Sequence, residues 1–130
     1  MSKRLAFCCG VLVLTLIGSA AFAQGIKRTV LQKIEFPEHY TAITAIAEVE
    51  PGVTAARHTH PGVESAYILE GEGDLHVEGQ PERRVKAGDS FQIGNAVPHD
   101  IKNVSSTKPL KVLSTYIIER DKPLATPTAK

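Results

Sequence analysis

The chain has little of what several common kinds of functional site require. Cysteine occurs only twice, as Cys8 and Cys9, and tryptophan is absent. Aromatic residues make up 5% of the 130 residues, and 15 basic residues nearly balance 14 acidic ones. Because no run of basic residues is present, charge gives no reason to expect binding to nucleic acid or to an anionic membrane surface.

The first 23 residues match an export signal. Two basic residues precede an apolar run at residues 5–17, and Ala21-x-Ala23 fits a cleavage site with small residues. The run is shorter than the roughly 20 apolar residues that a membrane-spanning helix needs, so we expect no stable membrane anchor. We therefore expect a signal peptide at 1–23, cleavage near Ala23, and a periplasmic or secreted protein.

Cleavage at this point would change the composition of the mature chain. It removes both cysteines, which excludes disulfides and metal sites built on thiolates. It also removes Lys3 and Arg4, which shifts the formal net charge from +1 to −1. A mature chain of this length is one domain. We expect that domain at 24–121 and a flexible tail at 122–130, which has two prolines and little apolar bulk.

Short segments in which apolar and polar residues alternate follow the signal. Clusters of glycine, proline, asparagine and aspartate separate them, and no segment convincingly predicts a helix. The alternation over 75–78 turns Leu75 and Val77 inward and His76 outward. His39 is likewise expected in solvent. The pattern predicts an all-β fold with strands at 30–36, 41–49, 57–60, 64–69, 75–78 and 110–118.

Three of the five histidines occur in an arrangement typical of a metal site. His58 and His60 are alternate residues of one predicted strand, so both side chains can point at one ion. Glu64 follows a Pro-Gly turn signal that lets the chain bring a carboxylate toward the same point. His99 lies far downstream. Imidazole nitrogens and carboxylate oxygens are ligands of divalent transition metals, so the sequence predicts a metal centre.

Glycines frame these residues at fixed spacings. The first segment reads Gly52-VTAAR-His58-T-His60-PGV-Glu64-SAYILE-Gly71, and the second reads Gly88-DSFQI-Gly94-N-Ala96-VP-His99-DIK-Asn103. This pair resembles the two conserved motifs of the cupin superfamily. The first motif matches in full. The second keeps the spacing of glycine, histidine and asparagine but has Gly94 and Ala96 where the family usually has proline and glycine.

The resemblance implies a double-stranded β-helix, or jelly-roll, barrel with a metal near one mouth. It implies His58, His60, Glu64 and His99 as ligands of iron, manganese, nickel, zinc or copper, among which ligand type does not choose. Glu64 can instead stand off the ion and act catalytically as a proton shuttle. Residues 25–36 form an extra strand before the core. Cupins often use such a strand to pair with a second subunit, so the resemblance also implies a homodimer.

Three kinds of function are open at this point. The resemblance favours a small exported metalloenzyme of dioxygenase, decarboxylase, lyase or isomerase type that acts on a small organic substrate. The second possibility is a module that binds or senses a metal or small ligand without turnover. In the third, the metal only clamps the barrel, and removing it lowers stability and nothing else.

Overall fold

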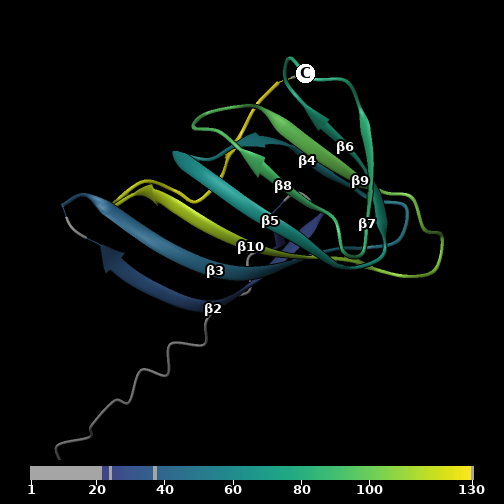
Figure 1. The fold of residues 1–130 in the computed structure, drawn as a ribbon, viewed down its shortest axis with the longest axis horizontal. Coiled ribbons are helices and arrows are strands. Elements are labelled where there is room, and N and C mark those ends of the chain that lie inside the picture. Colours follow the sequence, from purple (N-terminus) through teal and green to yellow (C-terminus); the bar gives the residue numbers. More distant parts are fainter. Residues whose placement is uncertain (1–21, 24, 37, 130) are drawn as a thin grey trace, which may run out of the picture.

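The computed structural model describes residues 22–23, 25–36 and 38–129, and these residues form strands, turns and loops. Two antiparallel sheets face each other across a hydrophobic core, which confirms the predicted all-β jelly-roll (Figure 1). The strands are β1 (Phe22–Ala23), β2 (Ile26–Phe36), β3 (Tyr40–Val49), β4 (Thr54–Thr59), β5 (Gly62–Glu70), β6 (Glu72–Val77), β7 (Arg83–Lys86), β8 (Ser90–Ile93), β9 (His99–Asn103), β10 (Leu110–Glu119) and β11 (Thr126–Pro127).

The two sheets have different strand lengths. The six-stranded sheet has the order β1-β2-β3-β10-β5-β8, and the five-stranded sheet has the order β11-β4-β9-β6-β7. Figure 1 shows the long strands β2, β3, β10 and β5 in one layer, with the shorter β4, β9, β6 and β7 in the other. The strands β3 and β10 pair along their full length, from Val49 with Leu110 to Tyr40 with Glu119.

Alternation of side chains builds the inner face of each sheet. In β3 and β10 every second residue is buried, as the sequence predicts. Burying one large aliphatic side chain contributes roughly 1.5–3 kcal/mol, so these strands supply much of the stability. Ser114 interrupts the apolar row of β10 although it is only 1% exposed, and it lies beside the motif histidines.

The turn between His60 and Glu64 depends on Gly62. A Cβ atom at Gly62 would lie 2.0 Å from the carbonyl oxygen of Ile117, so no other residue fits without a backbone shift. This close approach sets β5 against β10 and places Glu64 on the inner face of the sheet. The motif glycines Gly52, Gly71 and Gly88 all have positive φ angles.

The extra strand expected at 25–36 is present as β2, which starts at Ile26. This start is earlier than residue 30, where the alternating pattern places the first strand, and Ile26 packs in the core with 4% exposure. Residues 1–21 of the predicted signal peptide lie outside the described residues, whereas Phe22–Ala23 pair with β2 as β1. Among the described residues, no helix has the length and apolarity to cross a membrane.

The segment predicted to be a flexible tail lies against the barrel in the part that the structure describes. Thr126 pairs with Thr59, and the amide of Thr128 donates to the carbonyl of Arg57 at 3.0 Å. Leu124 packs against the buried cluster that contains Tyr116. Backbone pairing and one apolar side chain thus hold residues 124–128 in place, which composition alone did not predict.

Candidate metal centre

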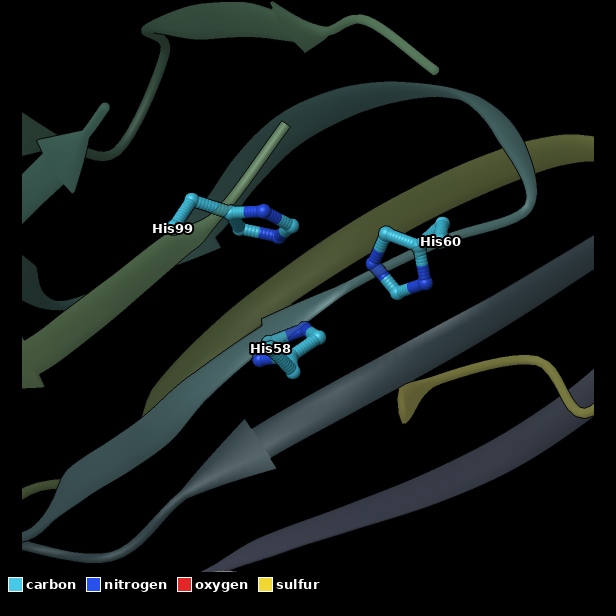
Figure 2. A group of neighbouring side chains, drawn as sticks. All are labelled: His58, His60 and His99. Atoms are coloured by element: carbon cyan, nitrogen blue, oxygen red, sulfur yellow. The ribbon is translucent and has the colours of Figure 1, made fainter. Parts of the chain in front are cut away.

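The three motif histidines meet between the two sheets. His58 lies near the end of β4, His60 follows that strand directly, and His99 begins β9, where it pairs with His58. All three are buried, with at most 4% exposure. Their ring centroids lie 4.4–5.1 Å apart (Figure 2). One ring nitrogen from each lies within 4.8 Å of the others, so the three histidines could hold one metal ion.

Backbone carbonyls orient the three rings in the same way. Each Nδ1 forms a hydrogen bond with a backbone carbonyl oxygen. The partner is Ala56 for His58 (2.7 Å), Leu124 for His60 (2.6 Å) and Val97 for His99 (3.0 Å). Since a carbonyl oxygen can only accept, each Nδ1 carries the hydrogen, and each Nε2 of a neutral ring keeps a lone pair. Metal-binding histidines characteristically donate their other N–H in this manner.

The surroundings of Nε2 of His60 indicate whether a metal fits between these side chains. It is buried and has no hydrogen-bond partner. It lies 3.2 Å from Oε2 of Glu64 without hydrogen-bond geometry, and Nε2 of His99 lies 3.4 Å from the same oxygen. Lone pairs and a carboxylate oxygen at these distances repel each other unless a cation lies between them. The donor set therefore fits a divalent transition metal.

Glu64 comes from the opposite sheet and is 5% exposed. Its Oε1 accepts a hydrogen bond of 2.6 Å from the hydroxyl of Ser114, which leaves Oε2 facing the imidazoles. Burial raises the pKa of Glu64, and the hydrogen bond from Ser114 is among the contacts that lower it. A carboxylate must be ionised to bind a metal.

Two further side chains have shifted pKa values. Burial, aided by the neighbouring His99, lowers the pKa of His58 to about 4, so its ring is neutral at pH 7 and need not lose a proton to bind a metal. Burial raises the pKa of Tyr116 to about 12, and the charge of Glu64 adds to this rise. Tyr116 therefore stays protonated, and its ring lies 4.8 Å from that of His60.

A small cavity of about 30 Å³ lies at the centre. Polar side chains form part of its lining, and the rest is an apolar wall: Ile26, Ala47, Val49, Leu75, Phe91, Ile101 and Val112. A larger hollow of about 710 Å³ lies among Arg57, His76 and Asp100, but none of the four predicted metal ligands lines it. The space at the histidines is the chemically relevant one because the lone pairs point there.

The second motif positions His99 through backbone contacts. Ala96 has a φ of 57°, a left-handed conformation that explains why related sequences usually have glycine there. Its amide donates to the carbonyl of His60 at 3.0 Å, which ties the two ligand-bearing segments together. Asn103 is fully buried and donates to the carbonyls of Val49 and Lys108. These two residues shape the loop and do not line the cavity.

Three residues at the centre were not assigned to it from the sequence. Ser114 and Tyr116 share the inner face of β10, as the alternation predicts, but nothing in the strand pattern gave them a functional role. Arg28 also lines the cavity, and its Nη2 lies 3.2 Å from Nε2 of His58. It could have been found, because Ile26 and Arg28 alternate on one strand and so share a face.

The fold and the motif spacing are those of one known family. The sequence profile of the cupin domain matches residues 45–116, more than half of the chain. This protein belongs to the cupin family. No curated protein sequence matches the chain at a significant level.

Solved structures match the chain along much of its length. An RmlC-like cupin from Shewanella frigidimarina is 21% identical with a TM-score of 0.60, covering 92% of this chain and 95% of its own. DMSP lyase DddQ from Ruegeria pomeroyi is 24% identical with a TM-score of 0.59, covering 67% of this chain and 43% of its own. The oxalate decarboxylase from Lactobacillus farciminis is 23% identical with a TM-score of 0.62, covering 81% of this chain and 32% of its own. The chain thus spans less than half of either enzyme, and these similarities show the fold.

Proposed function

We propose that this cupin is an exported metalloenzyme that acts on a small organic substrate at a centre formed by His58, His60, Glu64 and His99. The observation that carries the proposal is the common orientation of the three imidazoles, whose Nε2 atoms converge while each Nδ1 is held by a carbonyl. A bound iron, manganese, nickel, zinc or copper ion would supply a Lewis acid or a redox centre.

Glu64 is proposed as the fourth ligand through Oε2. Ser114 holds Oε1 at 2.6 Å, which fixes the plane of the carboxylate and directs Oε2 toward two imidazoles. These observations favour ligation over the alternative role as a base.

The remaining lining residues define what the chain itself can do. The hydroxyl of Tyr116 stays protonated and so can donate a hydrogen bond to a bound molecule. Phe91 and Leu75 belong to the apolar wall that keeps bulk water away and strengthens electrostatic interactions inside. Lyase and decarboxylase reactions are the first to assay, since DMSP lyase and oxalate decarboxylase share the fold.

The alternative is a module that binds or senses a metal or small ligand without turnover. The cavity volume of about 30 Å³ favours it, because this volume holds only an ion and one or two water-sized groups unless a wall moves. A module of this kind would bind its ligand and release it unchanged.

The two functions can be separated by reloading chelated protein with each of the five metals. Each form is incubated with a panel of small organic acids and phenols, and substrate loss, CO₂ release and O₂ uptake are measured. The proposal expects turnover with one or two metals and none in folded His99→Ala. Ligands that raise the melting temperature of the loaded protein but are never consumed would favour the binding module.

We also propose a homodimer through the outer face of the six-stranded sheet. An apolar row crosses four strands there, since Ile34 pairs with Ala42, Ala42 with Ile117, and Ile117 with Val63. Ile34 is 68% exposed and Val63 is 46% exposed, and contiguous exposed apolar rows mark interaction surfaces. Light scattering should give twice the mass of the chain, and Ile117→Glu should halve it. A wild-type protein that stays monomeric over a 100-fold range of concentration would contradict the dimer.

Export is proposed from residues 1–23 alone. The basic start, the apolar run and Ala21-x-Ala23 support it. The mass of protein from the exported fraction should correspond to a chain that begins at Gln24, and an uncleaved chain retained inside the cell would contradict this.

A further inference from the structure

Arg28 lines the cavity at the candidate metal centre, and it has no acidic partner among the described residues. The ion pairs of the described residues engage Arg57, Arg84 and Arg120, but none of them includes Arg28. The Nε atom of Arg28 is buried and has no hydrogen-bond partner. A buried guanidinium donor without an acceptor is costly, so its position calls for an explanation.

The hydrogen bond that Arg28 forms with His58 competes with metal binding. Nη2 of Arg28 lies 3.2 Å from Nε2 of His58. Since Nδ1 of His58 donates to Ala56, Nε2 is the nitrogen that remains for a metal. One lone pair cannot serve both an ion and an N–H donor. Metal binding therefore releases the Arg28 donor into a cavity where its Nε already lacks an acceptor.

The charges of the loaded centre favour an anion as the new acceptor. A divalent ion and Arg28 would bring three positive charges, while a ligating Glu64 would bring one negative charge and the ligating imidazoles none. The excess positive charge lies in a site with an apolar wall, where it is poorly screened. The hydroxyl of Tyr116 interacts with Arg28 but is uncharged, so it cannot balance the charge.

We propose that Arg28 binds the carboxylate group of a small ligand beside the metal, so that the centre selects small carboxylate anions over uncharged molecules. The planar guanidinium matches a carboxylate and can bind it with two parallel hydrogen bonds. The cavity of about 30 Å³ limits the ligand to a few heavy atoms. The inference rests on the proposed metal centre but not on turnover.

The test uses cobalt(II)-loaded mature protein and the visible absorption of the cobalt as a readout that needs no activity. Acetate is titrated in, with uncharged acetamide of the same shape as the control ligand. The variants are Arg28→Gln, which removes the charge, and Arg28→Lys, which keeps the charge without the planar fork. Lys27→Gln is the matched control, because Lys27 precedes Arg28 but its side chain is exposed and pairs with Glu48. Circular dichroism and cobalt stoichiometry show that each variant is folded and loaded.

The expected results differ clearly between ligands and variants. Acetate should bind at least tenfold more weakly to Arg28→Gln than to wild type, with Arg28→Lys between them and Lys27→Gln unchanged, which matches the loss of one charge-assisted contact. Acetamide should bind weakly and equally to all four proteins. Equal acetate affinity in wild type and Arg28→Gln, or equal affinity for acetate and acetamide, would overturn the inference.

Failure of the metal centre gives a different result. A wild-type protein that takes up no cobalt contradicts the proposed function itself. Calorimetric titration of the metal-free proteins with acetate then decides the role of Arg28. Binding that disappears in Arg28→Gln supports an anion site without a metal, whereas no difference between the two proteins overturns it.

Discussion

His60 and His76 lie on opposite sides of the same barrel wall and have different surroundings. His60 is inside, 1% exposed, with Nδ1 bonded to a carbonyl and Nε2 without a hydrogen-bond partner. The side chain of His76 is outside and 39% exposed, with Nδ1 at 2.8 Å from Asp100 and Nε2 bonded to Glu82. A single carbonyl partner at Nδ1 leaves Nε2 of His60 with a lone pair. The two carboxylate partners of His76 instead favour a ring with a hydrogen on both nitrogens.

This contrast explains why the inner histidines His58, His60 and His99 fit a metal, whereas His76 on the outside does not. The bond with Glu82, and then that with Asp100, raises the pKa of His76 although desolvation opposes it. Burial lowers the pKa of His58 in the inner group to about 4. The bonds from Nδ1 to carbonyls leave the Nε2 atoms of the inner rings for a metal, while His76 is part of a charged surface network with Arg57 and Glu78. Carbonyl partners, rather than histidine content, distinguish a metal site here.

The largest expected effect is on metal affinity, and it distinguishes the inner histidines from His76. His60→Ala should weaken binding of a divalent transition metal by about a thousandfold or more, because one of the converging ligands is lost. His76→Ala should leave the affinity within about twofold. Competition titration with a chromophoric chelator measures both. Equal loss in the two variants would contradict the distinction between inner and outer histidines.

The second prediction concerns the pH dependence of the metal-free protein. The unfolded state protonates His58 near pH 6.5 and the folded state only near pH 4, so the unfolded state binds more protons between these values and stability falls as the pH decreases. This loss is on the order of 3 kcal/mol. Urea unfolding in EDTA at pH 7 and pH 4 should show this loss of unfolding free energy in the wild type. The unfolding free energy of His58→Gln should fall by about 3 kcal/mol less over the same pH range.

His76 should show the opposite and smaller pH dependence. Its folded pKa lies above the unfolded value, so its contribution is present below pH 6.5 and is lost as the pH rises through the folded pKa. Because His76 is more than a third exposed, solvent screening reduces this contribution. His76→Gln should therefore destabilise the protein more at pH 5.5 than at pH 9. The reverse order would contradict the ion pairs with Asp100 and Glu82.

A fourth effect compares two neighbouring residues of β10. Ser114 faces inward and bonds Glu64, whereas its neighbour Thr115 faces outward and lies 3.4 Å from the hydroxyl of Thr44. Ser114→Ala should lower metal affinity about tenfold, because groups that orient a ligand typically contribute that much. Thr115→Ala is the matched control and should leave the affinity unchanged. The same competition titration applies, and equal affinities for all three proteins would argue against ligation by Glu64.

The smallest effect concerns the loop that carries His99. Ala96 has a left-handed φ of 57°, which costs an ordinary residue about 1–2 kcal/mol. Ala96→Gly removes this strain but gives the unfolded chain more freedom, which offsets about 0.4–1 kcal/mol. The net gain in unfolding free energy should be below about 1 kcal/mol, with metal affinity retained. Urea unfolding tests it, and a clear destabilisation would show that the methyl group of Ala96 contributes packing.

Side-chain patterns predicted much of this protein, and backbone contacts account for much of what they missed. The alternation of β3, β6 and β10 gave the correct buried faces, and the motif spacing brought His58, His60 and His99 together. The tail was missed because its link to the centre is the carbonyl of Leu124, which any residue would supply. Arg28 was missed because polar residues 27–29 hide the alternation that begins at Ile26.

The most direct test is elemental analysis of mature protein recovered from the exported fraction, beside a His58→Ala/His60→Ala double variant. About one equivalent of a single transition metal in the wild type, absent from the folded variant, is the expected result. It would establish the inner histidines as the metal centre and select the reactions to assay. Two folded proteins that both lack metal would contradict the account, and a carbonyl-held imidazole cluster would then have to serve a purpose other than metal binding.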